Sequence, residues 1–391
     1  MERTFGHKIM KINSNVVADT RQIILMITNS CNLNCVYCYE KHKSFGNMTI
    51  ETAKTILTQE LKNLTTDVRS KRIEFSYLGG EPLLNFPLIK EVSDWLWTQD
   101  IILPYKFTVR TNGTLLTNEM KEWFSKNRNK IDVGLSMDGL STMNHFNRTK
   151  QISDWSFFCQ NWPQRRVKIV LFKDSVHLLS QTVREMNKAG IPLEIVIGEG
   201  FPWNEEAAGI LETQLANLIP DYLSISQEAV DSGLFSFNID DYFPKYPMHE
   251  VMFCGDQQKN IIAYDIDGSP CICHMFATPT IGEAKARWSW NHLKKIEVLP
   301  FDPECVKCPV HKNCKSCFGI NMMLYGDIYH SAAKTTICKA IQAKARACAF
   351  FYLKQIENKI HAQLHLIPEE QVYAEKALRL LEVIPSFAKT D

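Results

Sequence analysis

The sequence has almost no net charge, because 44 lysine and arginine residues balance 43 aspartate and glutamate residues and leave a formal charge of +1. A near-neutral chain has no global field that attracts nucleic acid or an anionic membrane, so any partner must be recognised locally. Residues 1–17 contain no apolar run of the length that a signal peptide or a membrane span needs. We therefore expect a cytoplasmic protein with neither a nucleic-acid nor a membrane partner.

Disulfides are not expected, although the chain contains 13 cysteines. A long chain without a signal peptide belongs to a reducing compartment, where thiols stay free and metal ligation explains the cysteines better. Three cysteines lie within residues 31–38 and eight within residues 254–338, which leaves Cys159 and Cys348 isolated. Such clustering indicates multinuclear metal sites, and the two isolated cysteines are interpreted as small buried hydrophobic residues.

The first half of the chain alternates short β-branched runs with amphipathic helical stretches, the pattern of a parallel sheet covered by helices. Strands are expected at residues 22–28, 72–78, 105–111, 131–137, 167–172 and 193–197. Helices are expected near residues 49–64, 86–98, 117–126, 153–161 and 175–189, with Thr49 and Thr117 as N-caps and Gly190 as a C-cap. This predicts an α/β fold, a partial (β/α)6 TIM-like barrel.

The predicted organisation has five parts. It comprises an N-terminal arm at 1–21, the barrel at 22–200, a helical bridge at 201–247, a small cysteine-rich domain at 248–345 and C-terminal helices at 346–391, with helices near 337–361 and 369–381. The unusual residues of the barrel follow its strands: the first cysteines, then residues 79–82, 112–113 and 138–139. That edge is the C-terminal rim, where barrel enzymes place their chemistry.

The cysteines Cys31, Cys35 and Cys38 have the spacing C-x3-C-x2-C on a loop that leaves the first strand. Three thiolates are one fewer than a four-iron cluster needs, so one iron keeps an open position that can chelate a substrate. Structural zinc is the alternative, but such a site usually needs a fourth Cys or His at finger-like spacing, and His42 is the close candidate.

With these cysteines, residues 79–82 (GGEP) and 136–139 (SMDG), the chain resembles the radical S-adenosylmethionine (SAM) superfamily from about residue 20 to 345. The resemblance implies a 4Fe-4S cluster on Cys31, Cys35 and Cys38, whose open iron binds the amino and carboxylate groups of SAM. Reduction then releases a 5'-deoxyadenosyl radical, so the cofactor carries the difficult chemistry. It also implies that Gly79 and Gly80 let the backbone approach the ligand and that Glu81 receives the SAM ammonium.

Further SAM contacts follow from the same resemblance. Ser136 is expected to hydrogen-bond polar groups of SAM and Arg148 to pair with its carboxylate, while Asp138 shapes the turn. Asn112 either reaches the ribose or forms an Asn-Gly turn. Tyr37 either lies near the adenine or packs in the protein.

Eight cysteines in the second half are enough to saturate two four-iron clusters: Cys254, Cys271, Cys273, Cys305, Cys308, Cys314, Cys317 and Cys338. The segment resembles the SPASM extension of peptide-modifying radical SAM enzymes, with the pattern C-x(9-15)-G-x4-C, then C-x2-C-x5-C-x3-C, then C. Cys254, Gly268 and Cys273 fit its first part. Cys317 follows Cys314 after two residues, where the family usually has three.

The family's crossing arrangement implies two auxiliary ligand sets. One consists of Cys254, Cys273 and Cys317, and the other of Cys305, Cys308, Cys314 and Cys338. The first set lacks a fourth ligand. Cys271 is one candidate, because residues two apart in a strand point to the same face, and an open iron that binds substrate is the other. His274, His311 and His330 lie near ligands as second-shell groups, and a zinc-ribbon-like module is the alternative for the whole segment.

The resemblance implies a maturase of ribosomally made peptides that forms a carbon-carbon (cyclophane-type) or thioether crosslink, with the auxiliary clusters as electron acceptors. The alternative is an anaerobic sulfatase-maturating enzyme, which forms formylglycine and needs a general base such as Asp256, Asp265 or Asp267. A non-catalytic iron-sulfur electron carrier or a zinc-dependent nucleic-acid-binding module is a third class, but neither explains GGEP on a barrel rim.

Three kinds of partner follow from this interpretation. They are a precursor peptide or sulfatase polypeptide as substrate, an electron donor such as flavodoxin or ferredoxin, and a separate leader-binding protein. Only about twenty residues precede the first strand, so leader recognition is expected to rest either on another surface of this chain or on that separate protein.

Overall fold

The computed structural model describes residues 2–5, 8–11, 20–64, 70–224, 260–293, 308–310, 317–326, 328 and 337–388. Its central feature is a set of parallel strands: β3 (Thr20–Thr28), β4 (Arg72–Gly79), β5 (Tyr105–Thr111), β6 (Ile131–Leu135), β7 (Val167–Leu171) and β8 (Leu193–Ile197). All of the predicted strands are confirmed to within two residues at their ends. Strands β3 to β6 form one sheet and β7–β8 another, joined by a parallel bridge between Ser136 and Lys168.

All of the barrel helices except α4 match their predictions. The barrel helices are α1 (Ile50–Leu64), α2 (Phe86–Leu96), α3 (Asn118–Lys126), α4 (Thr142–Asn147), α5 (Trp155–Asn161) and α6 (Leu179–Lys188), with the 3-10 turns η1 (Pro82–Asn85) and η2 (Val176–Leu178) before α2 and α6. Thr49 accepts from the amide of Thr52, and Thr117 from that of Met120, so both predicted N-caps are confirmed. Gly190 ends α6 with a φ of +71°, which favours glycine. The short helix α4 was not predicted.

Alternation along β3 shows how the core forms. Ile23, Leu25 and Ile27 point to the helix-covered face and are buried there. Ile24 and Met26 point to the other face and pack against Ala263. Aromatic rings extend the helix-side core, since Tyr77 of β4 stacks on the ring of Phe107 in β5 at 5.5 Å. Burial on both faces explains why these strands are nearly continuous apolar runs.

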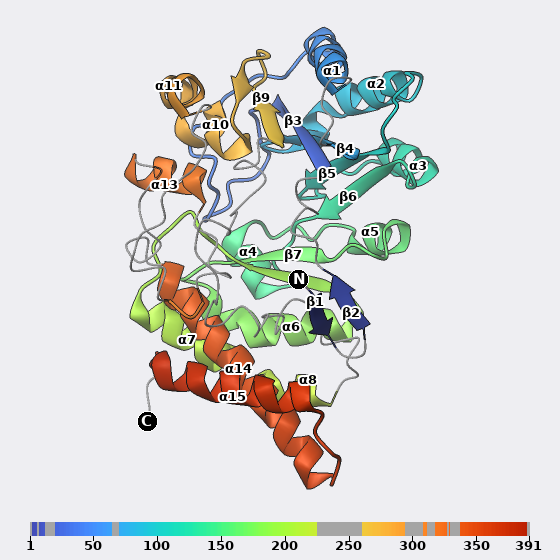
Figure 1. The fold of residues 1–391 in the computed structure, drawn as a ribbon. Coiled ribbons are helices and arrows are strands. Elements are labelled where there is room, and N and C mark those ends of the chain that lie inside the picture. The colour runs from blue at the N-terminus through green and yellow to red at the C-terminus, as the bar shows by residue number, and fades with distance from the viewer. Residues whose placement is uncertain are drawn as a thin grey trace.

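The cysteine-rich region adds strands to the edge of the barrel sheet. Strand β9 (Ile261–Tyr264) pairs in parallel with β3, and β10 (Pro270–Cys271) pairs antiparallel with β9, so the sheet order is β10-β9-β3-β4-β5-β6. Beyond β10 follow η5 (His274–Phe276), α10 (Thr278–Ile281), α11 (Glu283–Leu293) and α13 (Phe318–Tyr325). This region therefore lies directly beside the strand that precedes the first cysteines (Figure 1).

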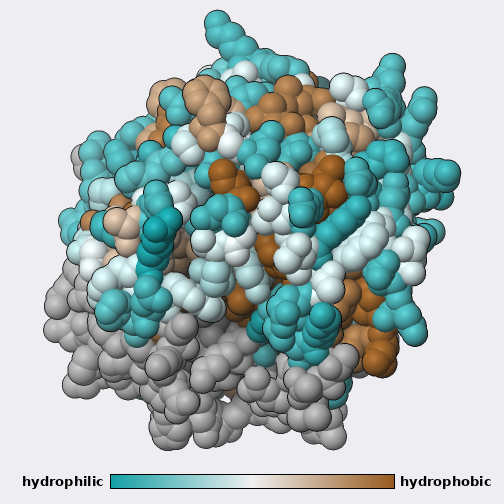
Figure 2. Space-filling model, turned by 90° about the horizontal axis from the view of Figure 1, so that it is seen from above, coloured by the Kyte–Doolittle hydropathy of each residue, from teal (hydrophilic) through white to brown (hydrophobic). Residues whose placement is uncertain are grey.

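The remaining helices are α7 (Glu205–Ala216), α8 (Ile219–Leu223), α14 (Ile337–His361) and α15 (Pro368–Val383). Helices α14 and α15 are the predicted C-terminal pair, and α14 packs on α7 (Figure 1). The predicted arm contains a hairpin of β1 (Glu2–Phe5) and β2 (Lys8–Lys11). On the face seen from above, hydrophobic residues lie in separate groups among hydrophilic ones (Figure 2). Among the described helices, none combines the length and apolarity that a membrane crossing requires.

Candidate functional site

The loop after β3 carries Cys31, Cys35 and Cys38, all partly exposed. A tight turn links two of them, because the amide of Cys38 donates to the carbonyl of Cys35 at 3.1 Å. The amide of Val36 donates to the carbonyl of Asn147 at 3.0 Å, which ties the loop to the end of α4. Since the loop itself contains neither helix nor strand, its contacts with other rim segments set the positions of the thiols.

Two cations accompany these thiols. Burial raises the pKa of Cys31 and of Cys35, while the nearby charges of Lys43 and Arg148 act in the opposite direction. Burial opposes the charge of Lys43, but the thiols of Cys38 and Cys31 raise its pKa above the ordinary value. A metal that binds here must displace thiol protons, and both cations then stabilise the resulting thiolates.

The donor set fits a cluster better than a single ion. Within the described ranges, no three Cys, His, Asp or Glu side chains are close enough together to hold one metal ion. The thiolates of a four-iron cluster each bind a different iron, so they stand farther apart than the ligands of one ion. The three loop cysteines can therefore serve such a cluster although they form no ready-made zinc site.

Gly79 and Gly80 bring the end of β4 against the cysteine loop. A Cβ atom at Gly79, whose φ is +145°, would lie 2.2 Å from the carbonyl oxygen of Thr28. A Cβ atom at Gly80 would lie 2.2 Å from the carbonyl oxygen of Ser30 and 2.9 Å from Cβ of Cys31. Only glycine permits this approach. The contact seen here is with the backbone beside the first cysteine, and the predicted contact of the glycines with a ligand stays a prediction.

Glu81 is buried, and its carboxylate accepts three hydrogen bonds. Oε1 accepts from the amide of Leu83 at 3.0 Å and from the hydroxyl of Thr111 at 2.5 Å, and Oε2 accepts from the amide of Asn112 at 2.8 Å. Burial raises the pKa of Glu81, and these donors partly oppose the shift. The carboxylate thus joins η1 to the end of β5, and an incoming ammonium would have to share its oxygens.

Asn112 connects the end of β5 to the cysteine loop. Its Oδ1 accepts from the amide of Thr114 at 2.9 Å, which is the turn interpretation of Asn-Gly. Its Nδ2 donates to Oδ1 of Asn32 at 3.0 Å, and Asn32 in turn donates to the hydroxyl of Thr114 at 2.8 Å. The side-chain amide of Asn112 therefore contacts the cysteine loop, and the predicted contact of Asn112 with the ribose stays a prediction.

Asp138 is fully buried and receives donors from three directions. Its Oδ1 accepts from the amide of Val170 at 3.0 Å, and its Oδ2 accepts from the hydroxyl of Tyr37 at 2.5 Å and from Nδ2 of Asn147 at 3.1 Å. Nε of Arg148 lies 3.1 Å from the same Oδ2. Asp138 therefore does more than shape a turn, because it joins β7, α4 and the cysteine loop.

Tyr37 and Arg148 complete this network. The guanidinium of Arg148 lies 5.3 Å from the centre of the Tyr37 ring, a cation-π distance. Burial opposes the charge of Arg148, but Asp138, Tyr37 and Cys35 outweigh it and raise the pKa of Arg148. Burial, followed by the charge of Asp138, raises the pKa of Tyr37 well above its usual value. Tyr37 thus packs within the protein, one of the two interpretations of this residue.

Two polar groups near the loop have spare hydrogen-bonding capacity. Oδ1 of Asn147 is buried without a hydrogen-bond partner in the described part of the chain. The partly buried Ser136 follows β6, and no hydrogen bond of its hydroxyl is seen among these residues. Buried polar atoms are rarely left unpaired, so these groups fit a polar ligand beside the cysteines.

Four of the described cysteines of the second half fall into two groups. Cys273 and Cys317 lie in one hydrophobic cluster, whereas Cys308 and Cys338 pack against the main core, where Cys338 raises the pKa of Cys308 in addition to burial. The two predicted ligand sets stay predictions. Several predicted residues lie outside the described part of the chain: Cys254, Cys305, Cys314, Asp256, His311 and His330.

The expectation that Cys271 and Cys273 share a face is wrong. Strand β10 ends at Cys271, so strand alternation does not extend to Cys273. Cys271 is buried with Ile24 and Met26 in a different hydrophobic cluster, and its Sγ donates to Oδ2 of Asp265 at 3.4 Å. Burial, followed by the charge of Asp265, raises the pKa of Cys271. Cys271 therefore has its own partner away from Cys273.

Tyr39, Lys43 and His274 are residues of this region whose positions the sequence did not reveal. Tyr39 is partly buried and packs against the hydrophobic cluster that contains Cys273, and its ring lies 6.3 Å from that of His274. Burial, followed by the charge of Lys168, lowers the pKa of His274 to about 4. Proximity to a predicted ligand was the available signal for all three, and it does not tell a second-shell group from a bystander.

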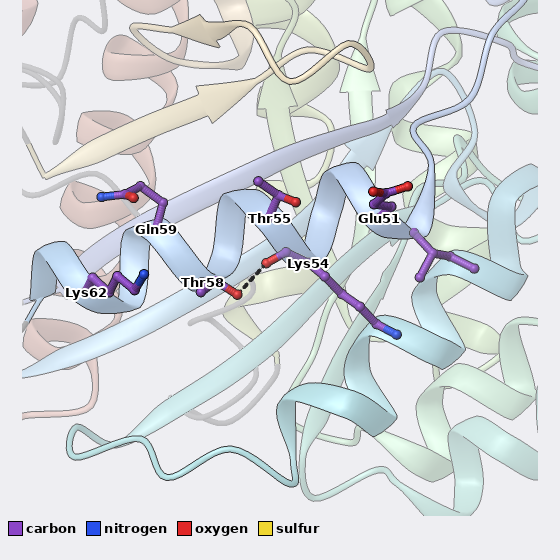
Figure 3. Close-up of a pocket in the computed structure, with 7 residues that line it drawn as sticks. Glu51, Lys54, Thr55, Thr58, Gln59 and Lys62 are labelled. Carbon is purple, nitrogen blue, oxygen red and sulfur yellow. Dashed lines mark hydrogen bonds between the residues drawn. The ribbon is translucent and has the colours of Figure 1, made fainter.

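A surface hollow lies beside α1, and no cysteine lines it. Figure 3 shows Glu51, Lys54, Thr55 and Thr58 of this helix, with the hydroxyl of Thr58 donating to the carbonyl of Lys54. A single helix supplies its walls, and neither cysteine nor histidine lines it. This hollow does not bear on the chemistry of the rim.

Residues 25–211 match the profile of the Radical SAM superfamily. An uncharacterized protein of Methanocaldococcus jannaschii is 36% identical over 125 residues, covering 32% of this chain and 41% of the relative. The radical SAM cyclopropyl synthase TigE of Paramaledivibacter caminithermalis is 29% identical over 119 residues, with coverages of 27% and 25%. A cysteine-type anaerobic sulfatase-maturating enzyme of Clostridium perfringens is 28% identical over 133 residues, with coverages of 32% and 35%. The chain thus spans less than half the length of these relatives.

The fold extends further than these alignments. The solved structure of native anSMEcpe with bound AdoMet and Cp18Cys peptide superposes with a TM-score of 0.58 at 17% identity, covering 87% of this chain and 99% of that one. The similarity shows a shared fold and includes the cysteine-rich side of the molecule. It confirms the predicted α/β barrel fold.

Proposed function

We propose, from the premise that residues 25–211 form a domain of the radical SAM superfamily, that this chain modifies a side chain of a peptide or protein substrate. One observation carries the proposal. The cysteine loop is tied to both of the other predicted motifs, because the carbonyl of Ser30 accepts from the amide of Glu81 in GGEP and the hydroxyl of Tyr37 donates to Asp138 in SMDG. Three thiols, the Arg148 guanidinium paired with Asp138, and the Ser136 hydroxyl are thereby brought to one rim.

Cys31, Cys35 and Cys38 would hold the 4Fe-4S cluster, and Ser136 and Arg148 would contact SAM. When bound, the reduced cluster and SAM supply the radical that abstracts a hydrogen atom from an unactivated carbon. The chain's own residues would orient the bound SAM and balance its charge. Arg148 stays protonated at physiological pH, since Asp138 raises its pKa, and it presents a fixed positive charge beside Cys35.

The glycines and Glu81 have a positioning role. Gly80 allows the β4 turn to touch Ser30, and the amide of Glu81 donates to the carbonyl of Ser30 at 2.9 Å. The Glu81 carboxylate then fixes the amide of Asn112. This chain of contacts holds the loop in place before a cofactor binds, so less ordering accompanies binding.

Within this class we favour an oxidative crosslink, of the carbon-carbon or thioether type, in a ribosomally made peptide. Similarity to a cyclopropyl synthase supports carbon-carbon bond formation. Formylglycine formation, suggested by similarity to a sulfatase-maturating enzyme, requires a general base. Of the predicted bases, Asp265 accepts from the amide and hydroxyl of Thr278, and Asp267 from those of Ser269. Both carboxylates are thus engaged in hydrogen bonds within the chain, while Asp256 lies outside the described residues.

The other components belong to the same proposal: two auxiliary 4Fe-4S clusters on the second cysteine field, a flavodoxin or ferredoxin as electron donor, and a leader-binding protein. Cys273 and Cys317 lie in one hydrophobic cluster, and Cys338 raises the pKa of Cys308. Both observations support two iron-sulfur clusters. As electron acceptors, they would oxidise the substrate radical after hydrogen abstraction.

The first test is cleavage of SAM. Protein reconstituted with iron and sulfide under anaerobic conditions and then reduced should convert SAM to 5'-deoxyadenosine, while Cys35→Ala should not. Cys159→Ala is a matched control, because Cys159 lies outside both cysteine groups. Zinc in place of iron in oxygen-protected protein would refute the proposal. The mass of a peptide substrate then separates the reactions, since a crosslink removes two hydrogens and formylglycine introduces an aldehyde.

A further inference from the structure

We propose that His274 provides the fourth ligand of the auxiliary cluster held by Cys273 and Cys317, through its Nδ1 atom. This inference rests on the proposed function, because it requires that an iron-sulfur cluster binds in the second cysteine field. The family pattern implies cysteine ligands and leaves this set one ligand short. The structure removes Cys271 from consideration and offers a histidine nitrogen in its place.

The two cysteines come together at the starts of two packed elements. Cys273 immediately precedes η5 and Cys317 immediately precedes α13. These elements are in contact, and their approach is close, since a Cβ atom at Gly319 would lie 2.3 Å from Cβ of Met275. Cys273 and Cys317 share the hydrophobic cluster that these elements form. Cys273 and Cys317, the described cysteines of this ligand set, therefore belong to one compact region beside β9 and α10 (Figure 1).

Tyr39 places His274 on the same side as these cysteines. The Tyr39 side chain packs against the hydrophobic cluster that contains Cys273 and Cys317. The rings of Tyr39 and His274 lie 6.3 Å apart in an edge-on arrangement. Tyr39 thus adjoins both His274 and the hydrophobic cluster of Cys273 and Cys317.

One nitrogen of the His274 imidazole has no hydrogen-bond partner among the described residues. Nδ1 of His274 is buried and has no hydrogen bond within the described residues. A buried polar atom without a partner costs about 1–3 kcal/mol, so native proteins rarely leave one. Cys271 shows the contrast, because its thiol donates to Asp265 on another side of β10. A bond from Nδ1 to iron would satisfy the nitrogen and complete the ligand set.

A neutral imidazole in place of a fourth thiolate would change the cluster. It lowers the negative charge on the ligands by one, and histidine ligation raises the reduction potential of iron-sulfur clusters. A higher potential makes the cluster a better electron acceptor, which is the role that the proposed oxidative reaction assigns to it.

The test uses full-length protein in which Cys31, Cys35 and Cys38 are all replaced by alanine, so that only auxiliary iron remains. After anaerobic reconstitution and reduction, pulsed electron paramagnetic resonance should show a strongly coupled histidine nitrogen. That coupling should vanish in His274→Ala. His274→Cys should retain the iron, lose the nitrogen coupling and lower the midpoint potential, because a thiolate replaces the imidazole. His292→Ala is the control, since its ring bonds the Trp288 carbonyl and it should keep the coupling.

A nitrogen coupling that survives in His274→Ala, or that is absent from the parent protein, would overturn the histidine ligand while leaving the auxiliary clusters in place. Failure of the parent to bind iron would instead remove the auxiliary clusters from the proposed function, and the ligand with them. Iron analysis and the spectra therefore distinguish the two failures.

Discussion

The carboxylate of Asp138 is fully buried, and the structure pairs it with an almost fully buried guanidinium. Replacing Asp138 by Asn keeps an oxygen for the amide of Val170 but removes the charge opposite Arg148. An uncompensated buried charge is strongly unfavourable, so we expect Asp138→Asn to lower the free energy of unfolding by about 3–5 kcal/mol. Chemical denaturation of the metal-free protein measures this difference.

Asp174→Asn is the matched control for Asp138. Asp174 pairs with Lys173 on the surface, where the Asp174 side chain is 51% exposed and the Lys173 side chain 30%. Exposed pairs contribute little, so this variant should stay within about 0.5 kcal/mol of the original protein. Equal losses in the free energy of unfolding would show that the buried pair stabilises the fold no more than the surface pair does.

The isolated cysteines allow a second prediction at the residue scale. Cys348 is buried in α14, and burial raises its pKa to about 12. Since the thiolate is the reactive form, roughly one molecule in ten thousand carries it at pH 8. In the native protein, iodoacetamide should therefore modify the partly exposed Cys159 well before Cys348, as peptide mass spectrometry would show. Equal rates in native protein would contradict this, whereas equal rates in denaturant are expected.

Residue types could be predicted at the site, but the partners of their side chains could not. The spacing of the cysteines and the GGEP and SMDG segments indicate the rim without any coordinates. That Glu81 turns inward to Thr111, or that Cys271 pairs with Asp265, depends on which groups the folded chain brings within hydrogen-bonding distance. Such choices are settled by tertiary contacts between segments far apart in the sequence.

At the scale of elements, the turn between β4 and η1 sets the position of the cysteine loop. A methyl group at Gly80 would overlap the carbonyl of Ser30 and approach Cβ of Cys31. Gly80→Ala should push the loop away while the barrel stays folded. Displacing groups that support metal ligands typically weakens metal binding by about 10- to 100-fold, and we expect a loss of that order. Chelator competition, followed through the SAM-sensitive electron paramagnetic resonance signal, measures it.

Gly190→Ala is the control for Gly80→Ala, because it strains the backbone without creating a steric overlap. Gly190 has a φ of +71°, but nothing lies within 4 Å of the position of its missing Cβ. The variant should lose about 1 kcal/mol of stability and keep its iron affinity. If Gly190→Ala lost iron as readily as Gly80→Ala, general destabilisation would explain both.

The individual strands were predictable, but one of their pairings was not. The β-branched and aromatic residues of β3 to β8 mark them as strands, and the helices between them imply parallel order. Nothing local indicates that Gln22 in β3 would pair with Ile261 in β9. Pairings between such distant segments depend on the folded surface available to them, so the attachment of the cysteine-rich region had to come from the structure.

At the scale of the whole molecule, Glu212 of α7 holds the end of the chain onto the barrel. Its Oε1 accepts from Nε of Arg346 at 2.8 Å, and its Oε2 accepts from the amide of Phe387 at 2.9 Å. Arg346 also donates to the carbonyls of Leu381 and Ile384, so one buried pair joins α7, α14 and the segment after α15. This arrangement couples the C-terminal helices to the fold of the barrel.

Glu212→Gln should loosen that coupling, because it leaves the Arg346 charge buried without its counterion at a cost of about 3–5 kcal/mol. Hydrogen exchange should accelerate across residues 337–388 while β3 to β6 remain protected. Glu205→Gln is the control, since Glu205 pairs with Lys339 between the same two helices but is mostly exposed. If exchange in β3 to β6 accelerated equally in Glu212→Gln, the barrel and the C-terminal helices would unfold as one unit, and the C-terminal helices would then be part of the cooperative core.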